Sequence, residues 1–226
     1  MNKIIKSIKR YERKWIFNTL DLNQICIFLY NTKFFFSTHY PNRQVNSIYF
    51  DDINHSSIKQ NLDGISEKKK YRLRWYGNYK MIKNPIFEIK SKSGFDVKKS
   101  SYKLNELNNL NLINLANINK IEKFINNNFN FKNRLYPIVT THYKRTYFIS
   151  SNRLIRATVD TDLKSLHLKS YKDINIMRGY NENILEMKYD VDLDFLVRDN
   201  VKDISVRFSK NSKFINSAMA LPDYLI

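Results

Sequence analysis

The sequence contains few of the residues that cross-link or interrupt a fold. One cysteine, Cys26, is present among 226 residues, so the chain has no internal disulfide and no cysteine-built zinc site. Four glycines and four prolines are spread along the chain and mark no linker. The four histidines do not have the spacing of metal ligands, and we expect structural or surface roles for His39, His55, His142 and His167.

Long apolar runs are also missing. The longest purely apolar run is Ile25 to Tyr30, and no apolar core of a signal peptide follows the basic residues from Met1 to Lys14. We therefore expect neither a signal peptide nor a membrane span. The expected location is the cytoplasm, with recruitment to the inner face of a membrane by a membrane-protein partner or by surface charge.

Acidic residues are outnumbered by basic ones. The chain has 39 lysines and arginines against 21 aspartates and glutamates, a formal net charge of +18. Such self-repulsion is tolerated mainly when the partner is an anion, so phosphate compounds, nucleic acid and a membrane surface are the candidates. Hydrophobic residues make up 42% and aromatic residues 14%, which is enough for one folded domain over residues 1–226.

The pattern of residues predicts an α+β fold built mainly from strands. Segments rich in aromatic and β-branched residues alternate with short polar breaks, and eight of them can close an antiparallel β-barrel. The expected strands are Tyr11 to Phe17, Gln44 to Asp51, Lys69 to Gly77, Pro85 to Ser91, Thr140 to Ser150, Leu154 to Asp160, Ile184 to Asp190 and Ile204 to Ser209.

Three helices are expected beside the strands. An asparagine-rich stretch from Ser100 to Asn128 has leucines and isoleucines spaced as one helical face, which predicts a helical insert at about residues 100–130. The bias toward asparagine is itself best explained by the composition of the source. A shorter helix is predicted from Asp21, a suitable N-cap, to Tyr30, and another follows Asn211 at the C-terminus.

Charged residues in the expected strands follow the two-residue period of a β-strand. Alternate side chains share a face, so Lys70, Arg72 and Arg74 lie together, opposite Tyr71, Leu73 and Trp75. Three strands carry a glutamate two residues before a lysine, and two more carry arginines. These are Glu12 with Lys14, Glu88 with Lys90, Glu186 with Lys188, Arg145, and Arg156 with Asp160.

Two arrangements of these charged faces are open. Taken singly, each face fits an ordinary solvated outer surface. Because the opposite faces are bulky and aromatic, a barrel can instead pack them against helices and turn its charges into the lumen. Several cations that converge on a lumen need an anion, since two unit charges about 4 Å apart repel by about 4 kcal/mol at an effective dielectric near 20.

Taken in order, these motifs resemble the VTC (vacuolar transporter chaperone) domain of polyphosphate polymerases, within the CYTH or triphosphate tunnel metalloenzyme superfamily. The resemblance covers nearly the whole chain. It rests on Glu12-Arg13-Lys14-Trp15, Ser47-Ile48-Tyr49-Phe50-Asp51, Tyr71-Arg72-Leu73-Arg74-Trp75-Tyr76, Phe87-Glu88-Ile89-Lys90, Tyr143 with Arg145, Tyr147 and Phe148, Arg156 with Asp160, Ile184-Leu185-Glu186-Met187-Lys188, and Ser212-Lys213-Phe214.

The resemblance implies an eight-stranded antiparallel barrel that forms a tunnel, and it implies roles for named residues. Catalytic positions would be Lys14, Arg72, Arg74, Lys90, Arg145, Arg156 and Lys188. Further substrate-binding positions would be Lys70, Lys98, Lys99, Tyr143, Lys210 and Lys213. The main metal ligand for Mn²⁺ or Mg²⁺ would be Glu186, with Glu12 and Glu88 as further ligands or as partners of neighbouring lysines.

Three functions are compatible with these expectations. The first is a polyphosphate polymerase that transfers the γ-phosphoryl of ATP to a growing polyphosphate chain. The second is a metal-dependent tri- or polyphosphatase or nucleoside triphosphatase of the same fold, and the third is a noncatalytic polyphosphate-binding module. Nucleic-acid binding fits the charge, but cations paired with carboxylates inside strands suit metal and phosphate better.

Overall fold

The computed structural model describes residues 3–7, 10–94, 96–168, 177–202, 206–209 and 211–220, which form a mixed α+β fold. The strands are β1 (Lys3–Ser7), β2 (Arg10–Phe17), β3 (Ser37–Asp51), β4 (Lys68–Tyr76), β5 (Ile86–Ser93), β6 (Asp96–Lys103), β7 (Tyr136–Ile149), β8 (Arg156–His167), β9 (Arg178–Gly179) and β10 (Asn183–Asp190). The helices are α1 (Leu22–Asn31), α2 (Ser56–Leu62), α3 (Leu115–Asn128), α4 (Asp194–Asn200) and α5 (Lys213–Met219), with short 3-10 turns at Asn105–Leu107 and Val191–Leu193.

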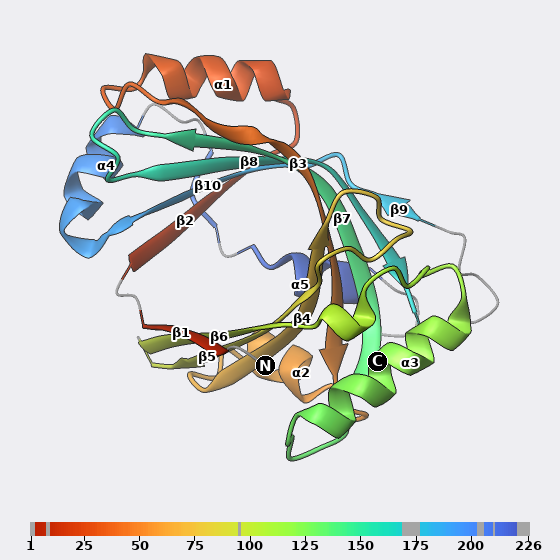
Figure 1. Ribbon diagram of the computed structural model, residues 1–226. Coiled ribbons are helices and arrows are strands. Elements are labelled where there is room, and N and C mark those ends of the chain that lie inside the picture. Colours follow the sequence, from red (N-terminus) through yellow and green to blue (C-terminus); the bar gives the residue numbers. More distant parts are fainter. Residues whose placement is uncertain are drawn as a thin grey trace.

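All ten strands belong to one antiparallel sheet. Its order is β1-β6-β5-β4-β3-β7-β8-β10-β2, and β9 pairs with β8. The two edge strands, β1 and β2, are consecutive in the chain, and the sheet curls strongly so that its two ends turn toward each other (Figure 1). The α+β class and the antiparallel, curled sheet of eight long strands with flanking helices are therefore confirmed.

Helices α1 and α4 cover the convex face of one half of the sheet (Figure 1). Trp15, Leu185 and Met187 are at most 2% exposed and belong to the same apolar cluster as Ile25 and Leu29 of α1. The side chain of Asp21 accepts a hydrogen bond from the backbone N–H of Gln24, and the Gln24 side-chain oxygen accepts one from the backbone N–H of Asp21, a capping box that begins α1. The predicted helix start is confirmed.

Helix α3 covers the convex face of the other half. Leu73, Trp75 and Phe87 are fully buried in the same cluster as three isoleucines of α3. The helical insert predicted at about residues 100–130 is too long. Residues 100–103 belong to strand β6, and helix α3 covers Leu115–Asn128. At least one asparagine has a structural role beyond composition: the Asn126 amide accepts from the backbone N–H of Leu135 and donates to its carbonyl.

One predicted strand was wrong, and three observed strands, β1, β6 and β9, were not predicted. The described residues of the expected strand Ile204 to Ser209, 206–209, form no strand. The eighth long strand is β6 instead, which pairs with β5 along its whole length and with β1. Its sequence, Asp96-Val97-Lys98-Lys99-Ser100-Ser101-Tyr102-Lys103, has almost no apolar alternation, so pairing with neighbours rather than local pattern makes it a strand.

The C-terminal part of the chain lies on the concave side of the sheet. Figure 1 shows α5 inside the curl, and its Phe214 ring stacks on Tyr49 of β3 with centroids 4.9 Å apart. Just before this helix, the backbone N–H of Ser209 donates to the carbonyl of Lys14 on β2. The predicted C-terminal helix is confirmed, and the segment that leads to it contacts both β2 and the middle of the sheet. No helix in the described part of the chain is long and apolar enough to cross a membrane.

Candidate functional site

The concave face of the sheet carries the charged side chains that the strand pattern grouped together. In β4, Leu73 and Trp75 are buried under α3, so Arg72 and Arg74 point to the opposite, concave side. Carboxylates on the same side hold these cations in three groups, centred on Glu186, Glu88 and Asp160. We call this surface the charged concave face. Its cations are Lys14, Lys70, Arg72, Arg74, Lys90, Lys99, Arg145, Lys188 and Lys213, and its carboxylates are Glu12, Glu88, Asp160 and Glu186.

The first group lies on the neighbouring strands β2 and β10. Lys14 Nζ is 3.3 Å from Glu186 and 3.0 Å from Glu12. Lys188 Nζ is 2.5 Å from Glu186 and 3.8 Å from Glu12. The other Glu12 contact is with Lys90 Nζ of β5, at 3.8 Å, and β5 lies near the opposite end of the sheet order. Glu12 therefore bridges the two ends of the curled sheet.

The Glu186 carboxylate is almost fully buried, at 6% exposure. Burial alone would raise its pKa, but Lys188, Lys14 and Arg145 outweigh it and hold the pKa well below the usual range. Burial likewise opposes the Lys14 cation, and the Glu186 and Glu12 carboxylates keep the pKa of Lys14 raised. Glu186 and Lys14 are therefore both charged at neutral pH.

The second group surrounds Glu88 of β5, which is 3% exposed. Arg72 donates to Glu88 Oε2 from Nε at 2.9 Å, while Arg74 and Lys99 contact Oε1 at 2.9 and 2.5 Å. Burial would raise the pKa of this carboxyl, but Arg72, Arg74 and Lys99 lower it to about 2. One anion is thus shared by three cations.

The third group is centred on Asp160 of β8, which is fully buried. Arg145 donates two hydrogen bonds to it, to Oδ1 at 2.6 Å and to Oδ2 at 2.7 Å, and Lys213 Nζ lies 2.5 Å from Oδ2. Arg145 and Lys213 also contact the ring of Tyr143, with 5.3 and 4.7 Å to its centroid. Lys213 comes from α5, so the C-terminal helix completes this part of the concave face.

The segment before α5 adds polar groups from the backbone and from Ser212. Lys14 Nζ donates to the carbonyl of Asn211 at 3.0 Å, and Lys70 Nζ donates to Ser212 Oγ at 2.9 Å. The Asn211 side chain is 7% exposed, and neither its amide nitrogen nor its oxygen has a hydrogen-bond partner in the described part of the chain. A bound ligand or water would supply those partners.

Among the described residues named above for this face, nine cations lie with four carboxylates. Lys70 shows the consequence: burial and the neighbouring cations Lys90 and Lys14 lower its pKa to about 7. Nearby carboxylates do not offset this repulsion, so an anion on the concave face would relieve it.

Among the described residues, two of the expected site residues, Lys98 and Arg156, form no ion pair with the carboxylates of these groups. Lys98 is exposed, and it alternates in β6 with Lys99, so it points away from Glu88. Arg156 is exposed at the start of β8, opposite Lys188 in the register and on the face of Asp160. Lys210 lies outside the described residues.

A divalent metal fits part of the expected ligand set. Among the described residues, no group of three or more His, Cys, Asp or Glu side chains is arranged to hold a metal. Glu186 and Glu12 share Lys14 and Lys188 and supply two carboxylates, which suffice for Mg²⁺ or Mn²⁺ only if phosphate oxygens and water complete the shell. Glu88 does not fit, because three cations already occupy its oxygens.

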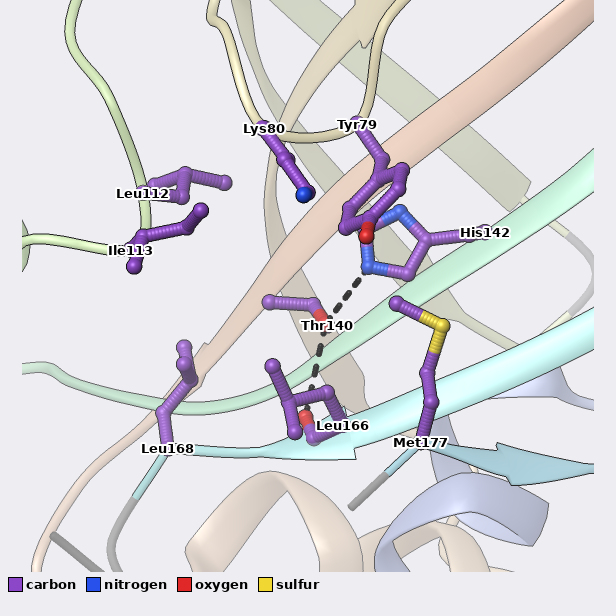
Figure 2. A pocket seen from close by; sticks show the side chains of 9 residues that line it. All are labelled: Tyr79, Lys80, Leu112, Ile113, Thr140, His142, Leu166, Leu168 and Met177. Atoms are coloured by element: carbon purple, nitrogen blue, oxygen red, sulfur yellow. Dashed lines mark hydrogen bonds between the residues drawn. The ribbon is translucent and has the colours of Figure 1, made fainter. Parts of the chain in front are cut away.

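The convex side carries a different kind of cavity, of about 130 Å³ (Figure 2). Its polar centre is His142, whose Nδ1 hydrogen-bonds Asn46 and whose Nε2 hydrogen-bonds Thr140, each at 2.9 Å. Burial, helped by Lys164, lowers the pKa of His142 to about 4, so the ring is neutral at pH 7. Among the described residues that line this cavity, Lys80 is the one charged group, so the described lining offers little to bind a phosphate.

Several residues of the concave face could not be assigned from the sequence alone. Asp160 was noted only as a companion of Arg156, although it holds Arg145 and Lys213. The Asn211 and Ser212 contacts depend on how the C-terminal segment crosses the sheet, which no local pattern encodes. In β7, the spacing Tyr143-x-Arg145-x-Tyr147 was a usable signal that this face continues to Tyr147.

Comparisons with solved structures support the fold. A candidate adenylate cyclase from Vibrio parahaemolyticus superimposes with a TM-score of 0.50 at 12% identity, covering 92% of this chain and 98% of that one. A Hippeastrum protein, described as a candidate adenylyl cyclase with a dominant triphosphatase activity, gives a TM-score of 0.51 at 12% identity, covering 95% and 98%. At such identities the likeness concerns the fold alone.

Comparisons of sequence define the family. No curated protein matches the chain. The VTC domain family matches residues 9–221, a range that includes β2 with Glu12 and Lys14, β10 with Glu186, and α5 with Lys213. Because this match spans nearly the whole chain, the protein belongs to the VTC domain family.

Proposed function

We propose that this VTC domain is a polyphosphate polymerase, which transfers the γ-phosphoryl of ATP to the end of a growing polyphosphate chain. The observation that carries the proposal is the charged concave face, where nine cations from six strands and α5 meet only four carboxylates. A phosphate chain is an anion long enough to contact cations from many strands at once. Membership of the VTC family supports polyphosphate or triphosphate as the ligand class.

Phosphoryl transfer needs mainly alignment and neutralisation of charge, which these side chains can provide. Arg72 and Arg145 are held by buried carboxylates, so their guanidinium groups are fixed and can clamp nonbridging oxygens. Lys90 and Lys188 are about half exposed and can follow the moving phosphoryl group as mobile point charges. No covalent nucleophile is required in this scheme.

A divalent cation would be held by Glu186, with Glu12 beside it. When bound, Mg²⁺ or Mn²⁺ neutralises charge on phosphate oxygens and orients them. In the structure Lys14 and Lys188 contact both carboxylates, and Lys14 also donates to the Asn211 carbonyl, so a metal would have to share Glu186 and Glu12 with these two lysines.

Hydrolysis is the second candidate. The Hippeastrum protein with a similar fold is described by its triphosphatase activity, and a curled basic sheet can present a phosphate chain to water as well as to another phosphate. A noncatalytic polyphosphate-binding module is the third candidate, since ion pairs alone suffice for binding. The residues of the concave face are compatible with each of the three functions. The products formed from ATP therefore have to distinguish these functions.

The proposal is tested by the products formed from ATP. Purified protein is incubated with ATP and Mn²⁺ or Mg²⁺, and long phosphate chains and free phosphate are measured separately. We expect long chains that form only with the metal. Free phosphate without chains would assign the hydrolase, and unchanged ATP together with tight polyphosphate binding would assign the binding module. Competition with single-stranded DNA is expected to leave polyphosphate bound.

A further inference from the structure

One arginine near the charged concave face is surrounded by rings rather than by carboxylates. The Arg43 guanidinium carbon lies 5.6 Å from the ring centroid of Tyr40, 5.4 Å from that of Tyr76 and 5.8 Å from that of Tyr147. The rings of Tyr40 and Tyr147 meet edge to face, with centroids 5.7 Å apart. We call Tyr40, Arg43, Tyr76 and Tyr147 the tyrosine cluster.

The tyrosine cluster lies on the concave side, where the sheet becomes narrower. Strand β4 ends at Tyr76, which is paired with Val45, while β3 continues to Ser37 with only β7 beside it. Arg43 is opposite Arg145 in the register, and Tyr40 is opposite Tyr147. Residues opposite one another share a face, so the cluster is on the side of Arg145 and Asp160.

The cluster is continuous with the cations that are expected to hold phosphate. The Arg74 guanidinium, which contacts Glu88, also lies 5.4 Å from the centroid of Tyr76. Tyr76 is therefore in contact with Arg43 on one side and with Arg74 on the other. Burial raises the pKa of Tyr147 and outweighs the nearby Arg145 and Arg43, which lower it. The Tyr147 phenol is therefore neutral.

The cluster has exposed ring surface and an uncompensated cation. Tyr40 is 47% exposed, and Arg43 is exposed as well. Residues 22–50 include no aspartate or glutamate, and Arg43 has no ion pair within the described part of the chain. Aromatic rings with an adjacent guanidinium bind flat, delocalised ring systems by stacking and cation–π contact. A purine or pyrimidine base has this chemistry, and a bare phosphate chain does not.

We propose that the tyrosine cluster holds the base of a nucleoside triphosphate whose phosphates extend to Arg74 and Arg145. This inference rests on the proposed function and adds to it the place where the base of the nucleotide binds. Recognition by stacking accepts any base face, so purine nucleotides with their larger rings bind more tightly than pyrimidine nucleotides, without strict selection of one base.

The test compares ATP with methyl triphosphate, which carries the same charge without a base. Dissociation constants are measured by titration calorimetry for the wild type, for Tyr40→Leu and for the double variant Tyr40→Leu with Tyr147→Leu. Tyr79→Leu is the matched control, because Tyr79 is another partly exposed tyrosine but lines the convex cavity. Circular dichroism establishes that each variant is folded.

We expect the wild type to bind ATP more tightly than methyl triphosphate. Tyr40→Leu is expected to weaken ATP binding by about 5- to 150-fold, the range for one lost stacking ring, with methyl triphosphate affected by less than about two-fold. Equal affinity of the wild type for the two compounds, or an equal loss for both in Tyr40→Leu, would overturn the tyrosine cluster as a base site and leave the phosphate site intact. Absence of binding for both compounds in the wild type would overturn the proposed function as well.

Discussion

The two faces of the same strands differ in how their side chains are paired. In β4, Leu73 and Trp75 are completely buried on the convex face, while Arg72 and Arg74 alternate with them on the concave face. The convex face is packed against helices and its polar groups are paired within the protein, as the neutral ring of His142 illustrates. The concave face has more cations than the protein can pair. The convex face therefore needs no ligand to pair its polar groups, whereas the concave face needs a bound anion to balance its cations.

The largest effect is expected at the carboxylate assigned to the metal. Glu186→Gln keeps the shape but removes the negative charge that Lys14, Lys188 and a metal would share. We expect metal-dependent turnover of ATP to fall by about 100-fold or more, with the fold retained. Asp162→Asn is the control, because Asp162 is a half-exposed carboxylate paired with Lys144 outside these groups, and it should leave turnover unchanged. Full activity of Glu186→Gln would refute the metal assignment.

The next effect concerns stability without ligand. Glu88→Gln leaves Arg72, Arg74 and Lys99 together without their anion, and removal of one partner from a buried pair costs about 3–5 kcal/mol. Denaturant unfolding should show a loss of this order, partly restored by triphosphate. Glu122→Gln, which breaks the more exposed pair with Arg134, should cost less than about 1 kcal/mol.

The pH dependence of the stability of the fold provides a second test of the role of Glu88. Its carboxyl has a pKa of about 2 in the folded protein, below the ordinary value, so it stabilises the folded state above about pH 4.5. That stabilisation should be lost as the pH falls toward 2. If Glu88→Gln and the wild type lost stability equally over this range, Glu88 would not be the shared anion.

A smaller effect on triphosphate binding is expected to distinguish two adjacent lysines of β6. Lys99 contacts Glu88 on the concave face, whereas Lys98 is exposed on the other side of the strand. Lys99→Met should weaken triphosphate binding by about ten-fold, and Lys98→Met by less than about two-fold, since exposed charges are screened. Equal losses in the two variants would show that net charge rather than the concave face governs binding.

The smallest effect is a dependence of affinity on pH. Lys70 has a pKa of about 7 in the free protein, and a bound anion raises the pKa of a nearby ammonium group. Triphosphate affinity should therefore fall by a few-fold as the pH rises from about 7 to 9, with uptake of a proton on binding. Lys70→Arg stays charged and should lack this component, which separates it from the titration of triphosphate itself. An identical pH profile in both proteins would contradict the crowding of cations around Lys70.

Much of the fold could be predicted because the strands are strongly amphipathic. The alternation in β4 and β10 is encoded in adjacent residues, so the face of each charge follows from the sequence once a strand is recognised. Strand β6 escaped prediction because it has few apolar residues, and a long-range pairing with β5 defines it. The expected strand after Asp203 had a suitable composition, yet residues 206–209 form none.

The candidate site was predictable strand by strand but not as a set of contacts. The pairing of Glu12 with Lys90 requires the sheet to curl until β2 and β5 approach each other, which no local pattern determines. The contact of Lys213 with Asp160 requires α5 to lie inside the curl. The tyrosine cluster was not predicted, because a bulge between Tyr40 and Arg43 brings both side chains to the same face.

The most direct measurement is the position of a phosphate chain on this protein. Crystals soaked with inorganic triphosphate and Mn²⁺ should show the chain on the concave face, between Arg72 and Arg145, with anomalous scattering from Mn²⁺ beside Glu186. A triphosphate bound on the convex surface, or a concave face that stays free of phosphate at saturating concentration, would contradict the claim that these cations form a phosphate-binding site.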